Sequence, residues 1–226
     1  MALNVVETID DLIRVKNVII SVFDKSGLTG FVEDLLRINP GIRIYSTGNT
    51  YATLTGAFPQ QADNFVAIAD YTGQPEMQGG LVKTLDFKIY LGLLSETYNE
   101  AHNRDLQRVE GVPFDMVVGN LYPFRQVIQQ PGTSAENARS HIDIGGPCMI
   151  RAAAKNFIRI AAVTDIDDYA LITKELQKHE GKIGLALRFE LAKKAFLHTA
   201  QYDTAISEYL IERDFAEITS CYNKER

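Results

Sequence analysis

The sequence contains few of the residues from which metal sites and disulfide frameworks are built. Its 226 residues include two cysteines, Cys148 and Cys221, which are too far apart for a disulfide framework or a zinc-binding spacing. The four histidines are scattered along the chain, at His102, His141, His179 and His198. No apolar run approaches the roughly 18 residues that a membrane-spanning helix needs. These absences leave no support for metal or membrane chemistry, and we expect a cytoplasmic protein with reduced thiols.

The chain also has no excess of positively charged residues. The chain has 23 lysines and arginines against 29 acidic residues, so its net charge of −6 argues against a surface that coats nucleic acid. The first residues, "MALNVVETIDDLIRV", contain acids and alternate in polarity, which is not typical of a secretory signal. A hydrophobic content of 46% is that of an ordinary globular protein. We expect one domain over residues 1–226, with a core at about 17–166 and a helical part at about 167–215.

Short β-branched, apolar runs alternate with helix-like stretches along the first two thirds of the chain. Five such runs are bounded by turn residues, at 17–23, 41–46, 65–70, 114–122 and 158–165. Nearly continuous apolar strands predict a parallel sheet covered on both faces. The pattern is helical from about residue 167 onward. The sequence therefore predicts a three-layer α/β sandwich with a five-stranded, mainly parallel sheet and a C-terminal helical extension.

Small hydroxyls, glycine and lysine follow the first two predicted strands. Ser21 and Lys25 lie at the end of the first, and "STGNT", with Thr47, Gly48 and Thr50, follows the second. Gly48 would let backbone N–H groups approach an anion, and the following helix dipole would favour negative charge. Each feature alone is more often a helix cap or a solvated lysine. The carboxyl ends of parallel strands lie at the same edge of a sheet, so these hydroxyls, the glycine and the lysine should lie close together. In combination they predict a site for a phosphorylated ligand.

The stretch "IDIGGPCMIRAAAKN", at 142–156, places a carboxylate before a helix start. Asp143 precedes Gly145, and Arg151 and Lys155 follow at helical spacing. An ordinary capped helix with one solvated face would explain the same residues. The alternative is one wall of an anion-binding active site, with Asp143 as a base.

Two further segments add polar groups to the same edge. The fourth predicted strand ends in Asn120 and Tyr122. The glycine-rich segment 70–94 is too irregular for one helix and is typical of a loop that wraps a ligand. Within it, Lys83 and Thr84 follow a glycine pair, so Lys83 would be able to donate to an oxyanion, although a mobile surface lysine is the simpler explanation.

Together these stretches resemble the IMP cyclohydrolase domain of the bifunctional AICAR transformylase/IMP cyclohydrolase family. The matches run in the family's order over about residues 18–210: "ISVFDKSGL", "STGNT", "DYTGQPEM", "GGLVKTL", "NLYPF", "IDIGG", "RAAAKN" and "KAFLHTAQYDTAISEYL". The resemblance implies a methylglyoxal-synthase-like fold and a homodimer. It also implies closure of 5-formamidoimidazole-4-carboxamide ribonucleotide (FAICAR) to IMP, with loss of water and without a metal or organic cofactor.

Site residues follow from the resemblance, motif by motif. It implies that Lys83 and Tyr122 stabilise the formyl oxygen, that Asp143 accepts or orients the carboxamide proton, and that Lys155 assists at the reacting groups. The substrate-binding residues that it implies are Ser21, Lys25, Thr47, Gly48, Thr50, Thr84, Asn120 and Gly145. Eight residues of helix from Pro147 to Lys155 span about 12 Å, so Asp143 and Lys155 need not be adjacent within one chain. Three alternatives remain open: local folding at the helix start brings the two residues together, they act at different ends of the ligand, or a neighbouring protomer contributes one of them.

The chain departs from the family's pattern at three positions near the predicted lysine. Leu81 stands where the family has arginine, and Asp86 and Phe87 stand where it has a His-Pro pair. The arginine would have supplied a charge-assisted donor worth roughly 1.5–3 kcal/mol when buried. Lys88 or Arg151 would be candidates to compensate for it.

Three functional hypotheses remain open at this point. The first is a stand-alone IMP cyclohydrolase that receives its substrate from a separate AICAR transformylase. The second is a catalytically impaired purine-nucleotide-binding module that partners such a transformylase. The third is a methylglyoxal-synthase-like lyase, which would use the phosphate turn but has no need for "NLYPF" or "IDIGG". None of the three needs a nucleic acid or a membrane.

Overall fold

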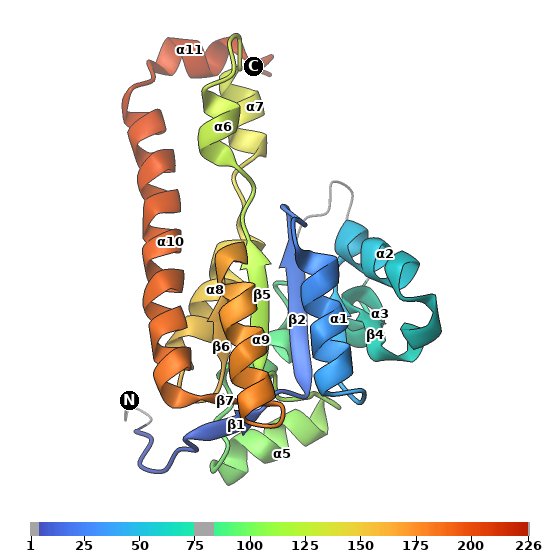
Figure 1. The fold of residues 1–226 in the computed structure, drawn as a ribbon. Helices are drawn as coiled ribbons and strands as arrows, with labels where there is room; N and C mark the ends of the chain where they lie inside the picture. Colours follow the sequence, from blue (N-terminus) through green and yellow to red (C-terminus); the bar gives the residue numbers. More distant parts are fainter. Residues whose placement is uncertain (1–4, 75–83, 226) are drawn as a thin grey trace.

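A parallel β-sheet forms the centre of the molecule (Figure 1). The computed structural model describes residues 5–74 and 84–225. Within them the sheet has five strands in the order β4-β3-β2-β5-β6, and every neighbouring pair is parallel. The strands are β2 (Asn17–Val22), β3 (Arg43–Ser46), β4 (Phe65–Ala67), β5 (Met116–Asn120) and β6 (Ala161–Val163). The predicted α/β class and all five predicted strands are confirmed, although the run at 65–70 leaves the sheet at Ala67 and continues as a helix.

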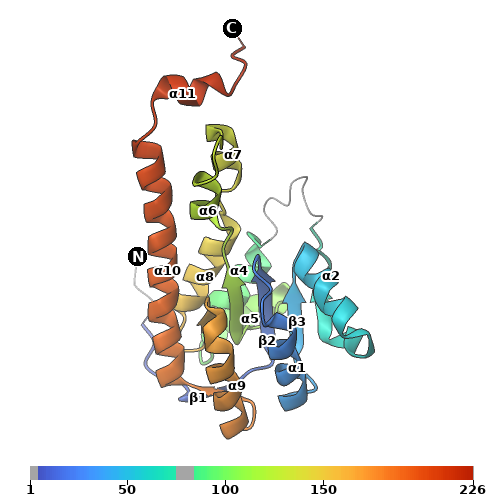
Figure 2. The same cartoon turned by 45° about the horizontal axis from the view of Figure 1, so that its top comes forward.

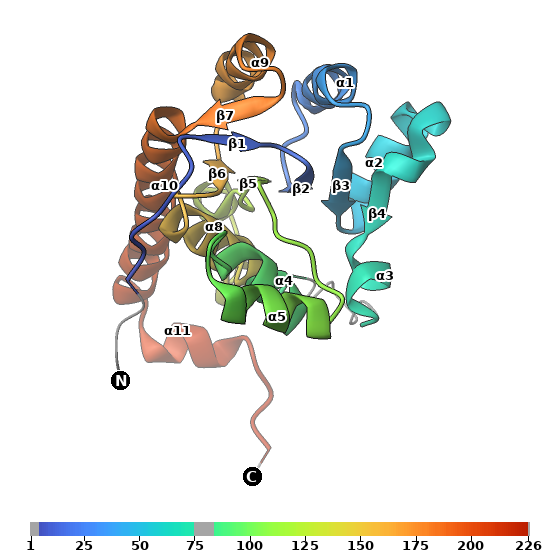
Figure 3. The same ribbon diagram turned by 90° about the horizontal axis from the view of Figure 1, so that it is seen from below.

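Helices cover both faces of this sheet, as the view from below shows (Figure 3). One face carries α1 (Leu28–Ile38) and α9 (Tyr169–Lys178), and the other carries α4 (Phe87–Leu94) and α8 (Gly145–Lys155). The shorter or peripheral helices are α2 (Gly48–Ala57), η1 (Pro59–Asn64), α3 (Ile68–Thr72), α5 (Glu100–Arg108), α6 (Phe124–Ile128), α7 (Ala135–Ser140), η3 (Ile166–Asp168) and α11 (Phe215–Ser220). The arrangement is the three-layer sandwich that the alternating pattern predicts.

The two-residue period of the strands divides the core into two clusters. In β2, Val18 and Ile20 pack in the cluster on the α1–α9 face, whereas Ile19 packs in the cluster on the α4–α8 face. In β5, Met116 belongs to the first cluster and Val117 to the second. Both faces of the central strands are therefore buried, which explains why their sequences are almost continuously apolar.

The longest helix, α10 (Leu185–Ile211), extends beyond the sandwich (Figures 1 and 2). Its first half packs against β6 and α8, and its second half continues past the carboxyl edge of the sheet beside α6. There, Phe124 of α6 makes edge-to-face ring contacts with Tyr202 and Tyr209 of α10. The predicted C-terminal helical extension is thus present, and it stands beside the edge at which ligands are expected.

A small antiparallel ribbon corrects the prediction that the chain is purely helical after residue 167. Strand β1 (Leu12–Arg14) pairs with β7 (Lys182–Gly184) beneath the sheet. Each strand has three residues, too few for a periodic signal, and its partner lies far away in the sequence. The ribbon brings the N-terminal segment against the start of α10.

Arg188 fixes this junction. Its side chain is fully buried, and burial lowers its pKa to about 10. The guanidinium donates hydrogen bonds of 2.6–3.1 Å to the backbone carbonyls of Asp10, Asp11, Phe157, Ile158 and Ile183. Because these five bonds match its five N–H donors, the buried cation is solvated entirely by main chain.

Candidate functional site

The site expected from the sequence lies where the chain reverses its direction of travel across the sheet. From β2 the chain moves outward to β3 and β4, and it then crosses to β5 and β6 on the other side. Ser21 and Val22 of β2 lie opposite Gly119 and Asn120 of β5. The carboxyl ends of β2 and β5 therefore form a topological switch point, the position at which open α/β sheets bind ligands.

Asn120 joins the two sides of this switch point. Its Oδ1 accepts hydrogen bonds from the backbone N–H groups of Phe23 and Asp24, at 2.7 and 2.9 Å. Its Nδ2 donates to the carbonyl of Asp24 at 2.8 Å. Asn120 therefore lies at the predicted site, and its side-chain amide is hydrogen-bonded to the loop that follows β2.

The predicted phosphate turn lies beside it, at the end of β3. The hydroxyls of Ser21 and Thr47 are 3.0 Å apart, and both residues are partly exposed. Helix α2 begins directly after Thr47, with Gly48 at a φ of 40°, which favours glycine. Thr50 is buried, and its hydroxyl donates to the carbonyl of Val22 at 3.2 Å. Ser21 and Thr47 thus present hydroxyls at a helix N-terminus, while Thr50 ties that helix to β2.

Lys25 lies in the loop after β2 and is partly exposed. Its Nζ lies 3.3 Å from the carbonyl of Val22 and 3.4 Å from that of Phe23. The neighbouring Asp24 accepts a hydrogen bond from the backbone N–H of Ser26 at 2.8 Å, and hydrogen bonding to Ser26 lowers the pKa of Asp24. The loop is therefore ordered by its own polar groups, with the ammonium group close to the switch point.

Asp143 lies in the tight turn that opens α8. Burial raises the pKa of its carboxyl group, while hydrogen bonds from the backbone N–H groups of Gly146 and Tyr122 act in the opposite direction. The bond from Gly146 to Oδ1 is 2.9 Å long. A Cβ atom at Gly146 would lie only 2.6 Å from Oδ2 of Asp143, so this turn requires glycine. Asp143 is thus a half-buried carboxyl group held by two loops, an arrangement suited to proton transfer.

Two other predicted residues converge on this turn. Thr84 is buried, and a Cβ atom at Gly145 would lie 2.9 Å from its hydroxyl oxygen, so the two residues are in close contact. Tyr122 follows β5 by two residues, and its side chain is 49% exposed. The structure therefore brings Thr84, Tyr122, Asp143 and Gly145 together beside Asn120.

Of the two predicted catalytic lysines, Lys83 and Lys155, the structure describes only Lys155. Lys83 lies outside the described residues. Lys155 is exposed in the last turn of α8, ten residues and roughly 15 Å along the helix from Gly145. Within one chain, Lys155 is not brought to the Asp143 turn.

Of the residues that depart from the family pattern, Asp86 has a local structural role. Asp86 caps α4, accepting a hydrogen bond from the backbone N–H of Lys88 at 2.7 Å. The ammonium of Lys88 donates to the carbonyl of Tyr71 at 2.9 Å and lies over the Tyr71 ring. The guanidinium of Arg151 lies 5.6 Å from the Phe196 ring on the outside of α8. Both candidate cations therefore lie against aromatic rings, and Leu81 itself is outside the described residues.

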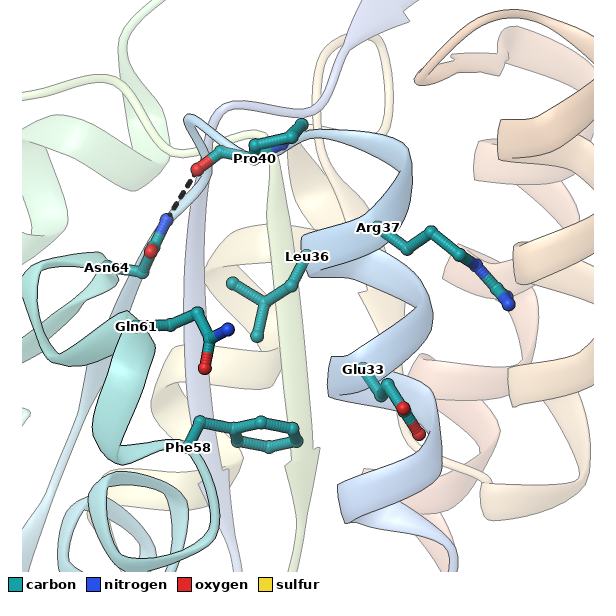
Figure 4. Close-up of a pocket in the computed structure, with 7 residues that line it drawn as sticks. All are labelled: Glu33, Leu36, Arg37, Pro40, Phe58, Gln61 and Asn64. Atoms are coloured by element: carbon teal, nitrogen blue, oxygen red, sulfur yellow. Dashed lines mark hydrogen bonds between the residues drawn. The ribbon is translucent and has the colours of Figure 1, made fainter.

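A groove of about 310 Å³ lies elsewhere, between α1 and η1 (Figure 4). Leu36 faces Phe58 and Gln61 across it, and Asn64 donates to the carbonyl of Pro40 at 2.8 Å. None of the predicted site residues lines this groove. The chemistry-bearing side chains therefore gather at the switch point and not in this cavity.

No group of three or more histidine, cysteine, aspartate or glutamate residues in the described part of the chain is arranged to hold a metal ion. No helix in that part is long and apolar enough to cross a membrane.

Tyr202 is a site neighbour that the sequence did not predict. Its hydroxyl oxygen accepts a hydrogen bond from the backbone N–H of Asp143 at 2.8 Å. The two residues are separated by 59 positions and lie on different elements, so no local pattern could have paired them.

An open parallel sheet with polar groups from β2, β3, β5 and the α8 turn at its switch point defines an α/β domain with polar side chains at the position where such sheets bind ligands. Residues 27–148 match the MGS-like domain, and residues 153–225 match the AICARFT/IMPCHase bienzyme. The chain belongs to the family of MGS-like domains, in the branch related to that bienzyme.

Individual relatives agree with this assignment. The bifunctional purine biosynthesis protein PurH of Neisseria gonorrhoeae FA 1090 is 43% identical over 196 residues, covering 87% of this chain and 36% of that protein. PurH of Listeria welshimeri is 42% identical over 215 residues, covering 93% of this chain and 41% of that protein. The chain thus spans well under half of these relatives. The crystal structure of ForH superposes with a TM-score of 0.72 at 32% identity, covering 86% of this chain and 98% of ForH.

Proposed function

We propose that this protein is an IMP cyclohydrolase of purine biosynthesis, which closes the ring of FAICAR to form IMP with loss of water. The observation that carries the proposal is the position of Asp143. A half-buried carboxyl group with a raised pKa lies in a glycine turn beside Thr84, Asn120 and Tyr122, at the switch point of an MGS-like domain. Its relatives named PurH are bifunctional proteins of purine biosynthesis.

The reaction needs a base and an oxyanion donor. The carboxamide nitrogen of FAICAR attacks the formyl carbon and loses a proton, forming a tetrahedral intermediate whose oxygen becomes a hydroxyl group. The hydroxyl then leaves as water, while the former formamide nitrogen loses its proton and forms a C=N double bond to that carbon. Asp143 would accept or orient the carboxamide proton, since an amide is a poor nucleophile. The Tyr122 hydroxyl and Lys83 would donate hydrogen bonds to the formyl oxygen as it gains charge, and Lys83 would protonate the leaving hydroxyl. Alignment of the two groups of one molecule would supply much of the remaining acceleration.

The 5′-phosphate would bind at the N-terminus of α2. The hydroxyls of Ser21 and Thr47 and the backbone at Gly48 line that position, and Lys25 would supply a cation from the adjacent loop. Thr50 would support the turn through its bond to Val22. Thr84, Asn120 and Gly145 would border the base, on the side of Asp143.

Lys155 would act only across a subunit boundary, because it lies at the far end of α8 from Asp143 within one chain. This supports a homodimer as the working state, and sedimentation velocity on the purified protein would test it. We expect the enzyme to act in the cytoplasm, on a purine ribonucleotide supplied by an AICAR transformylase activity, and to require no cofactor.

The experiment that tests the proposal is conversion of FAICAR to IMP, followed by ultraviolet absorbance. Wild-type protein should turn over, and both Asp143→Asn and Lys83→Ala should lose roughly 100-fold or more in kcat. Absence of turnover by folded wild-type protein would refute the proposal.

A second candidate is a purine-nucleotide-binding module that has lost catalysis and partners an AICAR transformylase. It is favoured by the engagement of Lys88 with Tyr71 and of Arg151 with Phe196, because these are the two cations that were candidates to replace the family's arginine. This candidate predicts that IMP or FAICAR binds to the wild-type protein without turnover.

A further inference from the structure

An exposed aromatic pair stands at the switch point. Phe23 directly follows β2 and is 51% exposed, and Tyr122 follows β5 and is 49% exposed. Their ring centroids are 5.3 Å apart, and the rings are inclined at 58°. Because the rings touch, they form one continuous apolar surface at the carboxyl edge of the two central strands.

The position of this pair is fixed by the backbone around it. Asn120 holds the loop after β2 through the N–H groups of Phe23 and Asp24. The backbone N–H of Tyr122 lies close enough to the carboxylate of Asp143 to oppose the rise in its pKa. Both rings therefore project from anchored main chain, and a ligand that covered them would lose little additional loop entropy.

The order of groups along the edge indicates which part of a nucleotide would reach these rings. Thr47 follows β3, Ser21 is the last residue but one of β2, and Asn120 ends β5, so the α2 N-terminus and the aromatic pair are separated by one to two strand spacings of about 4.8 Å. The carboxylate of Asp24 lies next to Phe23 and would repel a phosphate there. With the phosphate at α2, the planar base would lie toward Phe23, Tyr122 and Asp143.

We propose that Phe23 and Tyr122 form a platform that contacts the flat face of the substrate's heterocyclic base, which makes Phe23 a specificity-determining residue. This inference rests on the proposed function for the identity of the base. Aromatic rings bind the faces of heterocycles through dispersion and desolvation, and they do not contribute to the binding of ribose or phosphate.

The test compares Phe23→Ala and Phe23→Trp with wild-type protein in equilibrium binding of IMP and of ribose 5-phosphate, which lacks a base. Phe23→Ala should weaken IMP binding roughly tenfold, with no change for ribose 5-phosphate, and Phe23→Trp should retain IMP binding. With FAICAR, Phe23→Ala should raise KM more than it lowers kcat. Phe189→Ala is the matched control, because Phe189 is 46% exposed on α10, away from this edge.

Three outcomes would overturn the platform: unchanged binding of IMP to Phe23→Ala, equal weakening of both ligands, or a wild-type protein that does not bind IMP. Equal weakening would mean that Phe23 only shapes the loop of the phosphate site. Wild-type protein that binds IMP but does not convert FAICAR would refute the cyclohydrolase while leaving the binding comparison decisive for Phe23.

Discussion

The backbone N–H of Asp143 donates a hydrogen bond to the phenolic oxygen of Tyr202, 2.8 Å away on α10. The hydroxyl of Tyr202 in turn lies 3.3 Å from the carbonyl of His141, two residues before Asp143. Tyr202 is buried between α8 and α6, so the C-terminal helix holds the turn that carries the candidate base. The helical extension is therefore part of the site's support.

Replacement of Tyr202 by phenylalanine should lower kcat for FAICAR by roughly five- to tenfold, since one hydrogen bond contributes about 1–1.5 kcal/mol. KM should change little, because Tyr202 positions Asp143 and does not contact the ligand. Steady-state kinetics would measure both constants. Tyr209→Phe, on the same helix, is the control; equal effects of the two variants would contradict a specific role for Tyr202.

The activity should depend on the protonation of Asp143. Burial raises its pKa above the ordinary value of 3.8, and only the ionised form can accept a proton. The value of kcat/KM should therefore fall as the pH falls through the raised pKa, with a midpoint above pH 3.8. A pH–rate profile with no acid limb above that value would count against Asp143 as the base.

The same shift has an effect on stability. Because the folded-state pKa of Asp143 is raised, folding favours its protonated form, and that contribution is lost as the pH rises through the folded-state pKa. Relative to Asp143→Asn, the free energy of unfolding of the wild type should decrease as the pH rises from the ordinary pKa of 3.8 through the raised pKa of the folded state. Urea titrations of both proteins at a series of pH values would measure the difference, and a difference independent of pH would show that the carboxyl group does not titrate there.

The two threonines of the phosphate turn should behave differently when replaced by valine. Thr47→Val removes a partly exposed hydroxyl and should weaken binding of IMP roughly tenfold without affecting inosine, which lacks the phosphate. Thr50→Val removes a buried bond to Val22 and should lower the free energy of unfolding by about 1–2 kcal/mol. Calorimetric titration and urea unfolding would separate the two effects; a loss of inosine binding in Thr47→Val would argue against a phosphate contact.

Arg188 should be essential for stability. Arg188→Met would leave five backbone carbonyls without their donor and should cost at least about 3 kcal/mol of unfolding free energy. The control is Arg37→Met, which removes an exposed arginine paired with Asp34 and should change stability by about 0.5 kcal/mol or less. Similar midpoints for both variants in urea would contradict the role assigned to Arg188.

The sequence predicted most of what depends on local periodicity. The alternation of apolar runs with helix-like stretches predicted the sandwich, and the five strands follow from apolar runs between turn residues. The gathering of Ser21, Thr47, Asn120 and Tyr122 followed from the rule that parallel strands share a carboxyl edge. These features needed no knowledge of distant contacts.

The remainder depends on partners far apart in the chain. The β1–β7 ribbon, the contacts of Arg188 and the bond from Asp143 to Tyr202 each join segments with no common pattern. Lys155 is a different case, because it belongs to the same short motif as Asp143 but lies at the opposite end of the 11-residue helix α8.

The junction made by Arg188 has a consequence for genetics. Every acceptor it contacts is a main-chain carbonyl, so exchanging the side chains at positions 10, 11, 157, 158 and 183 would leave the bonds in place. Suppressors of an Arg188 substitution should therefore not arise as compensating residues at these five positions. They would have to act by stabilising the fold elsewhere. Substitutions at position 188 should therefore not be coupled to changes in the side chains at these five positions.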